Sequence, residues 1–188
     1  MRMSNIENYK YDWIWKKSNK TGFQHAKNMP LKDYEIISIF SNASIGHANL
    51  LGDKRMVYNP QGIIKIDKVS KNGKNRFVNI VGKRPSHKDV FITEYTNYPT
   101  TTLNFNKDAN SFHPTQKPVA LLEYLINTYS NEGELVLDNT AGSMSTAIAA
   151  INTKRKCICI EKDDEYFKIG SERVEKRLKE IKEDLFNE

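Results

Sequence analysis

The stretch that decides the fold runs from residue 113 to residue 161 and reads HPTQKPVALLEYLINTYSNEGELVLDNTAGSMSTAIAAINTKRKCICIE. Apolar residues recur at helical spacing after Pro118, two short apolar runs have the length of strands, and small residues separate the first run from a second helical segment. These patterns predict, in order, a helix at 119–126, a short buried strand at 134–138, a turn at 139–146, a helix at 147–151 and a strand at 156–161.

Two acids end the two predicted strands of this stretch. The order strand, small-residue turn, helix and strand is the first half of a Rossmann-like nucleotide site, in which small residues let a ligand approach the backbone. Glu161 lies roughly twenty residues beyond the turn, where an acid accepts hydrogen bonds from two ribose hydroxyls. Asp138 ends the first strand and needs a positively charged partner.

The ligand that suits both acids carries an ammonium group beside a ribose, and S-adenosylmethionine is the common cofactor of that description. A nicotinamide dinucleotide is disfavoured, because its pyrophosphate favours three spaced glycines and the turn holds only Gly142.

Three segments, 113–118, 138–143 and 160–166, together resemble the C-terminal half of a bacterial or phage DNA methyltransferase that acts on a base amino group. In permuted members of that family the cofactor motifs follow the catalytic motif along the chain. The resemblance covers nearly the whole sequence, since earlier segments resemble the two strands that follow the catalytic region: 13–17, Gly22, Phe23, Ala26, Pro30 and 34–40.

The resemblance implies an α/β fold, the Rossmann-like fold of S-adenosylmethionine-dependent methyltransferases, incomplete at its N-terminus and carrying a small β-rich insert. Its expected parts are N-terminal strands at 1–41, an insert like a target-recognition region at 42–112 and a cofactor-binding part at 113–188. The residues expected to bind the cofactor are Thr115, Lys117, Asp138, Ala141, Gly142, Ser143 and Glu161.

Each of the polar residues in that set also has a purely structural interpretation. Thr115 and Lys117 suit the methionine carboxylate of the cofactor, but helix capping and a solvated lysine explain them equally well. Asp138 and Glu161 are alternatively caps of the helices that follow them.

Two departures from the family pattern matter. Met144 stands where the family usually has a second glycine, so the loop is expected to approach the cofactor less closely. The family's Asp/Asn-Pro-Pro-aromatic motif, which holds the target base and its amino group, is absent, and 58–61 and 97–99 are only its nearest matches. No catalytic residue is therefore assigned.

Composition indicates a folded, soluble protein without a targeting or membrane segment. The chain has 188 residues, of which 38% are hydrophobic and 28% are charged. This length and this apolar content suffice for one domain with a hydrophobic core. Cys157 and Cys159 alternate on one predicted strand and are interpreted as core thiols in a reducing cytoplasm. No further metal ligands accompany them, so no metal site is predicted.

The formal net charge of +6 permits nucleic acid as a partner, and the distribution of basic residues is more informative. Between residues 65 and 88 a single acid, Asp67, stands among eight basic residues. Such a run is usually a solvated face, but beside a methyltransferase-like site it predicts contacts with phosphates of double-stranded DNA. The expected DNA-binding residues are Lys65, Lys68, Lys71, Lys74, Arg76, Lys83, Arg84 and Lys88.

The remaining elements follow from simple patterns. Residues 9–16 alternate, with Tyr11, Trp13 and Trp15 on one face, which predicts a strand whose aromatic stripe belongs to the core. His25 is interpreted as a local hydrogen-bond partner. Further predictions are a strand at 34–40, a loop at 41–51, short strands at 63–66, 77–81 and 90–92, and a charged helix at 163–188 whose stripe of Tyr166, Ile169, Val174 and Leu178 faces the core.

The sequence thus predicts a DNA amino-methyltransferase by descent, directed at adenine in preference to cytosine. The alternative is an inactive or split-gene fragment that acts only as a cofactor- or DNA-binding module. An upstream-encoded chain that carries the catalytic motif is the candidate partner, because two strands expected to join 135–137 to 34–40 are not found in this sequence. Alone, the chain is expected to be catalytically incompetent and poorly stable.

Overall fold

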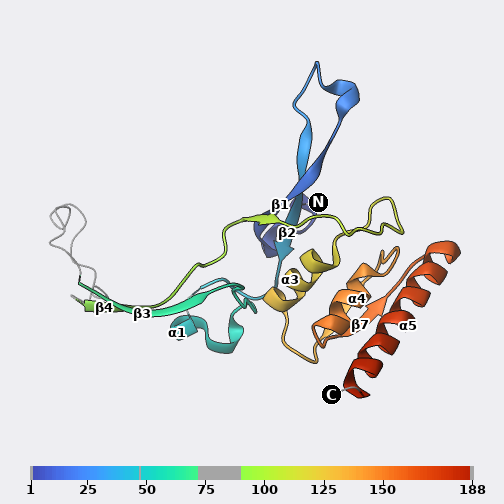
Figure 1. Ribbon diagram of the computed structural model, residues 1–188. Helices are drawn as coiled ribbons and strands as arrows, with labels where there is room; N and C mark the ends of the chain where they lie inside the picture. The colour runs from blue at the N-terminus through green and yellow to red at the C-terminus, as the bar shows by residue number, and fades with distance from the viewer. Residues whose placement is uncertain (1, 47, 72–89, 187–188) are drawn as a thin grey trace. The chain divides into compact units, whose positions relative to one another are not determined.

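An alternating aromatic strand at the start of the chain forms the first part of the fold. The computed structural model describes residues 2–46, 48–71 and 90–186 (Figure 1). After the 3₁₀ helix η1 (Arg2–Asn8), strand β1 (Tyr9–Thr21) pairs antiparallel with β2 (Lys32–Phe40) and parallel with β5 (Thr102–Asn104). The strands predicted at 9–16 and 34–40 are confirmed, whereas β5 was not predicted.

The aromatic face of β1 packs into the core, as the alternation predicted. Trp13 and Trp15 are buried with Leu103 of β5 and Leu121, while Ile14 points to the exposed face. The indole of Trp15 donates a hydrogen bond of 2.9 Å to the carbonyl oxygen of Phe105. The indole of Trp13 donates to the Tyr129 hydroxyl, so both indoles combine a large buried apolar surface with a satisfied N–H group.

A second, parallel pair of strands carries the helices. β6 (Leu135–Asp138) pairs with β7 (Lys156–Cys159), and α4 (Ser145–Asn152) packs against β7 between α3 (Val119–Tyr129) and α5 (Asp164–Phe186). Ala149 and Ala150 of α4 are fully buried, so α3 and α4 approach closely around Ile126. The predicted sequence of strand, turn, helix and strand is confirmed.

One face of the β6–β7 pair is uncovered in the described part of the chain. Leu135 and Leu137 are 59% and 63% exposed, and Ile158 of β7 and Ile160, which follows β7, are exposed as well. The strand predicted at 134–138 is present, but the prediction that it is buried is wrong, because helices cover only the opposite face. The prediction that Leu178 of α5 faces the core is also wrong, since that side chain is 43% exposed.

The sheet of β6 and β7 and the sheet of β1, β2 and β5 share no strand pairing among the described residues. β6 pairs with β7, and the other sheet has the order β2-β1-β5. Among the described residues, the outer edges of β6 and β2 have no neighbouring strand.

The chain divides into two compact units, and Pro60–Pro99 forms the smaller one. Its described residues form an antiparallel ribbon of β3 (Ile64–Lys71) and β4 (Val90–Thr96), with a bulge at Asp67, whose φ is 44°. The strand predicted at 77–81 lies outside the described residues. The unit falls within the insert predicted at 42–112, and the flanking residues belong to the larger unit.

The larger unit also contains three short helices. They are η2 (Phe23–His25) at the tip of the β1–β2 hairpin, α1 (Ala48–Leu51) and η3 (Gly52–Lys54). The prediction of a loop at 41–51 is wrong over 48–51, where α1 lies, and η3 follows directly after that segment. No helix in the described ranges is both long enough and apolar enough to span a membrane.

Candidate functional site

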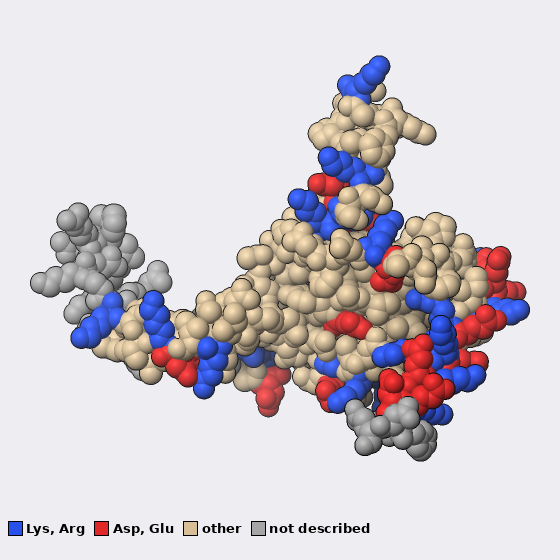
Figure 2. All heavy atoms as spheres, viewed as in Figure 1, with Lys and Arg blue, Asp and Glu red and all other residues tan. Residues whose placement is uncertain are grey.

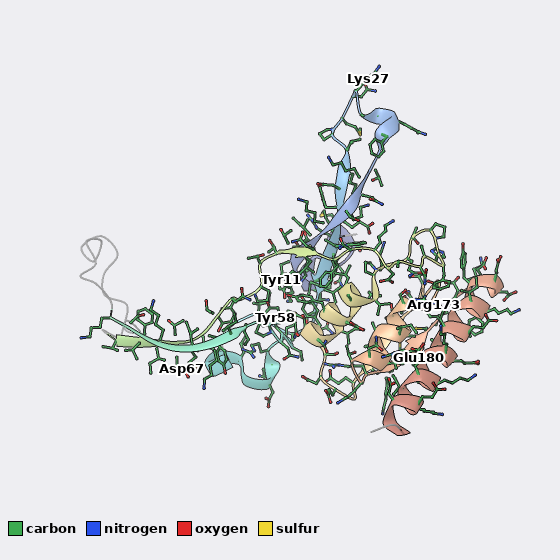
Figure 3. All side chains as sticks on the ribbon, viewed as in Figure 1. Tyr11, Lys27, Tyr58, Asp67, Arg173 and Glu180 are labelled. Atoms are coloured by element: carbon green, nitrogen blue, oxygen red, sulfur yellow. The ribbon has the colours of Figure 1, made fainter. Side chains whose placement is uncertain are left out.

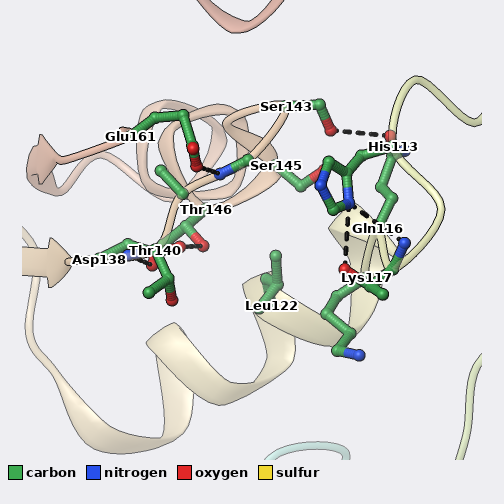
Figure 4. Close-up of a pocket in the computed structure, with 13 residues that line it drawn as sticks. His113, Gln116, Lys117, Leu122, Asp138, Thr140, Ser143, Ser145, Thr146 and Glu161 are labelled. Carbon is green, nitrogen blue, oxygen red and sulfur yellow. Dashed lines mark hydrogen bonds between the residues drawn. The ribbon is translucent and has the colours of Figure 1, made fainter. Parts of the chain in front are cut away.

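A cavity of about 440 Å³ opens where the loops after β6 and β7 meet the segment before α3 (Figure 4). The structure brings together there all seven residues that the sequence singled out for cofactor binding. They lie on three chain segments that are far apart in sequence. The cavity is lined by His113, Thr115, Gln116, Lys117, Leu122, Asp138, Thr140, Ala141, Gly142, Ser143, Ser145, Thr146 and Glu161.

Asp138 holds the turn that follows β6. Its Oδ1 accepts a hydrogen bond of 3.0 Å from the backbone N–H of Thr140, and its Oδ2 accepts one of 2.5 Å from the hydroxyl of Thr146. A carboxylate has about four acceptor positions, so each oxygen of Asp138 retains one for a ligand. Asp138 therefore does not cap α4, the alternative that the sequence left open, and its contacts within the turn are compatible with a binding role.

Glu161 joins the end of β7 to the small-residue turn. Its Oε2 accepts from the backbone N–H of Gly142 at 2.6 Å, and its Oε1 accepts from the N–H groups of Lys162 and Asp163 at 2.9 Å. The backbone hydrogen bonds from Asp163 and then Gly142 hold the pKa of this carboxyl below its ordinary value. Three of about four acceptor positions are occupied, which leaves room for one ribose hydroxyl rather than two.

Met144 adopts the backbone conformation of the glycine that it replaces. Its φ of 57° and ψ of 36° lie in the left-handed region that glycine favours. The side chain is buried beside Ala141 and Ala147 and does not line the cavity. The expectation that Met144 keeps the loop away from a ligand finds no support, since the side chain points to the core.

The segment before α3 is held by hydrogen bonds among its own residues. The Nδ1 atom of His113 lies 3.1 Å from the backbone nitrogen and 3.0 Å from the hydroxyl of Thr115. The His113 ring packs edge-on against Tyr166 of α5 at 4.2 Å between centroids. Thr115 does not cap α3, because the N–H of Val119 is instead within 3.3 Å of the Asp108 carboxylate.

Lys117 forms an ion pair that the sequence did not predict. Its Nζ lies 2.8 Å from Glu35 of β2, and Lys17 of β1 reaches the same carboxylate at 3.3 Å. Burial opposes ionisation of Glu35, but the hydrogen bonds and charges of Lys117 and Lys17 outweigh it and lower the pKa of the carboxyl. Lys117 is therefore paired with a carboxylate of the protein, and the interpretation of it as a simply solvated lysine is wrong.

Sequence reasoning missed Gln116, which lines the cavity, and Arg173, which contacts the small-residue turn from α5 without lining the cavity. The Oε1 of Gln116 accepts from the Ser143 hydroxyl at 2.9 Å, which ties the segment before α3 to the small-residue turn. Arg173 of α5 donates to the carbonyl oxygen of Ser143 and stacks on Phe112 at 4.6 Å. Burial lowers the pKa of Arg173. Gln116 stood between two predicted residues, whereas Arg173 gave no signal within its charged helix.

The two thiols lie behind the site. The Sγ atoms of Cys157 and Cys159 are 3.3 Å apart, a hydrogen-bond distance, and form no disulfide, and burial raises the pKa of Cys159 to about 12. Both side chains pack against the cluster around Met144, as core thiols would. Among the described residues, no group of three or more His, Cys, Asp or Glu side chains is placed to hold a metal ion.

The segments 58–61 and 97–99, the nearest matches to the absent catalytic motif, make structural hydrogen bonds. The amide of Asn59 donates to the carbonyl oxygens of Asn127 and Ser130, both at 3.1 Å, and so satisfies the C-terminal end of α3. Asn97 is in a left-handed conformation, with φ 60°, and donates to the carbonyl of Gly62 at 2.7 Å. Neither asparagine lines the cavity.

Three of the eight predicted DNA-binding residues lie on described backbone. Lys65, Lys68 and Lys71 are all exposed on β3, and Lys65 forms an ion pair of 3.2 Å with Asp67. The other five lie outside the described residues: Lys74, Arg76, Lys83, Arg84 and Lys88.

Several known proteins are similar in sequence to part of this chain. Residues 2–172 match the family described as DNA methylase, of the N6/N4 methyltransferase type. Over 63 residues, which are 34% of this chain, it is 51% identical to the DNA adenine methyltransferase YhdJ of Escherichia coli strain K12 and covers 21% of that protein. It is 43% identical over 63 residues to the type II methyltransferase M2.DpnII of Streptococcus pneumoniae, covering 34% of this chain and 24% of the relative.

Solved structures share its fold. The M1.HpyAVI–SAM complex matches 88% of this chain and 62% of its own at a TM-score of 0.54 and 22% identity. The cytosine-N4-specific PvuII DNA methyltransferase matches 90% of this chain and 53% of its own at a TM-score of 0.59 and 15% identity. The chain therefore spans less than two thirds of each of these relatives.

Proposed function

The chain belongs to the N6/N4 amino-methylating family of DNA methyltransferases, and we propose that it is the cofactor-binding and DNA-contacting part of an adenine-directed enzyme. The reaction is transfer of a methyl group from S-adenosylmethionine to the exocyclic amino group of adenine in duplex DNA. The observation that carries the proposal is the cavity in which Asp138, Glu161 and the 141–143 turn converge.

The residues that line the cavity fit S-adenosylmethionine, which supplies an activated methyl group when bound. A volume of about 440 Å³ is within the usual range of small-molecule sites. Asp138 has acceptor capacity left for the ammonium group, and Glu161 has capacity for a ribose hydroxyl. Thr115 and Lys117 stand on the opposite segment, where a hydroxyl and a cation suit the methionine carboxylate.

The preference for adenine rests on sequence similarity. The E. coli relative that is 51% identical over 63 residues is described as an adenine methyltransferase. The cytosine-specific PvuII enzyme is only 15% identical, and likeness at that level concerns the fold alone. The 60–99 unit, with its exposed lysines, is the proposed target-recognition part.

The alternative function is that of a split or inactive fragment that binds cofactor or DNA. An exocyclic amino nitrogen is a poor nucleophile, so an enzyme must place hydrogen-bond acceptors around it and hold the extruded base. No such motif occurs in this sequence. The bare apolar face of β6–β7 and the open outer edges of β6 and β2 favour completion by strands of another polypeptide segment.

Calorimetry with S-adenosylmethionine and with its demethylated product tests the cofactor assignment. Glu161→Ala should weaken the binding of both ligands by about tenfold or more, because it removes a charged acceptor. It also removes the carboxylate that accepts the hydrogen bond from the Gly142 N–H. Lys156→Ala, which changes an exposed residue of the strand that precedes Glu161, is the control. Tighter binding of a nicotinamide dinucleotide by the unmodified chain would overturn the proposal.

Glu161 also gives the stability of the chain a pH dependence with a defined sign. Because hydrogen bonds lower the folded-state pKa of Glu161 below 4.5, its contribution to stability is complete above that value. It is lost only as the pH falls further, through the folded-state pKa. Glu161 should therefore remain a charged acceptor throughout the neutral and mildly acidic range.

A further inference from the structure

The β1–β2 hairpin extends well beyond the core that its first half helps to form. Trp13 and Trp15 are the last fully buried residues of β1, and every residue from 18 to 30 is exposed. In Figure 1 the two strands project from the three-stranded sheet as a ribbon. Residues 16–32, called here the hairpin arm, thus do little to bury the core of the larger unit.

The tip of the hairpin arm is nevertheless an ordered turn with its own backbone hydrogen bonds. Gly22, with φ 92°, starts η2, and its carbonyl oxygen accepts from the N–H of His25 at 2.9 Å. The carbonyl of His25 in turn accepts from Asn28 at 2.8 Å and from Met29 at 3.0 Å. These are bonds of the His25 backbone, so the hydrogen-bonding role expected for its side chain stays a prediction.

The hairpin arm carries charge of one sign. It contains Lys16, Lys17, Lys20, Lys27 and Lys32 and no acid, and the first acid beyond it is Asp33, which lies on β2 between the partners of Lys16 and Thr21. Within the described ranges only Lys17 of these five forms an ion pair. Figure 2 shows the basic side chains along the ribbon, and Figure 3 places Lys27 at its far end. Like charges on a narrow ribbon repel one another, which a polyanionic partner would relieve.

Apolar side chains accompany the lysines at the tip. Phe23 is 67% exposed and Met29 is 58% exposed, and both flank the turn that holds His25. An aromatic and a methionine held away from any core contribute nothing to folding by burial. They suit contact with the apolar parts of a partner that is otherwise negatively charged.

The root of the hairpin arm borders the candidate cofactor cavity. Lys17 and Glu35 stand on its two strands, and Glu35 is paired at 2.8 Å with Lys117, which lines the cavity. A nucleic acid that presents a base to this cavity must pass close to the root. A two-stranded ribbon also has dimensions that the major groove of duplex DNA admits.

We propose that the hairpin arm is a second DNA-contacting surface, separate from the 60–99 unit. Lys16, Lys20, Lys27 and Lys32 neutralise phosphates of duplex DNA, and Phe23 and Met29 contact sugars or base edges beside them. The inference rests on the proposed function in that the substrate is DNA, but it concerns residues that lie outside the cofactor cavity.

The test measures binding of the 188-residue chain to a fluorescent mixed-sequence duplex over a range of salt concentrations. Changing Lys16, Lys20, Lys27 and Lys32 together to glutamine should weaken binding by about tenfold or more and reduce the salt slope by up to about 0.9 for each lysine. The double change Phe23→Ser and Met29→Ser should weaken binding while the salt slope stays the same.

The matched control removes the same charge from α5, where Lys168, Lys176, Lys179 and Lys182 are exposed among acids. Equal losses in the arm and control variants, or no binding of duplex by the unmodified chain at low salt, would overturn the inference. Calorimetry with S-adenosylmethionine separates the two proposals. If cofactor binding fails while the arm variants still lose DNA, the proposed function fails and the inference stands.

Discussion

At the scale of single residues, Met144 and Gly170 form a pair that neither position explains alone. Met144 holds a left-handed backbone, which costs a non-glycine residue roughly 1–2 kcal/mol. Its side chain offsets this cost by packing against α5 where Gly170 provides space. A Cβ atom added at Gly170 would lie 2.6 Å from Cγ of Met144, closer than van der Waals contact allows.

Gly170→Ala should therefore lower the free energy of unfolding by about 1–3 kcal/mol, the usual cost of overpacking. In a Met144→Ala background the same change should be neutral, or stabilising by up to about 1 kcal/mol, because alanine favours a helix interior. Urea denaturation of the two single variants and the double variant measures this coupling. Simple additivity of the two changes would show that the pair does not interact.

At the scale of elements, hydroxyl groups join β1 to the C-terminal end of α3. The Tyr129 hydroxyl accepts a hydrogen bond from the Trp13 indole N–H and lies 3.0 Å from the Tyr11 hydroxyl. Burial raises the pKa of Tyr129, so the group stays a neutral phenol at physiological pH. The sheet and the helix are thereby held in one register by polar as well as apolar contacts.

Tyr129→Phe should lower the free energy of unfolding by about 1–3 kcal/mol, since the indole N–H of Trp13 is left buried without its acceptor. Tyr98→Phe removes an exposed hydroxyl and serves as the control, with an expected change within about 0.5 kcal/mol. Chemical denaturation followed by tryptophan fluorescence reports both variants. Equal stability of the two variants would mean that the hydroxyl contributes nothing to this junction.

At the scale of the whole molecule, the β2-β1-β5 sheet and the β6–β7 sheet share no strand among the described residues. We expect this separation to limit both the stability and the activity of the chain. Exposed Leu135, Leu137, Ile158 and Ile160 lose the stabilisation that burial would give, about 1.5–3 kcal/mol for each side chain fully covered. A domain has only about 5–15 kcal/mol of net stability, so this loss is significant.

We expect the 188-residue chain to melt early or aggregate and to transfer no methyl group to unmethylated DNA. A polypeptide that carries the Asp-Pro-Pro-Tyr motif with its flanking strands, added in cis or in trans, should raise the melting temperature and permit transfer of labelled methyl groups. The same polypeptide with that motif changed to alanines should restore stability without transfer. Cooperative folding and methylation by residues 1–188 alone would contradict this prediction.

The sequence by itself determined the order of strands and helices from 113 to 186 and the α/β methyltransferase fold, which the solved relatives confirm. It could do so because small-residue turns, apolar runs and strand-end acids are local patterns. It also picked out seven residues that line one cavity, although their part in binding stays a prediction.

Only the tertiary structure decided which partners those residues have. Lys117 pairs with Glu35, which is 82 residues away in the chain, and Gln116 bonds to Ser143 across 27 residues. It also showed that Met144 packs into the core and that one face of β6–β7 stays bare. Such contacts depend on how separate elements pack, and the periodicity within any one segment carries no information about a neighbour that is distant in sequence.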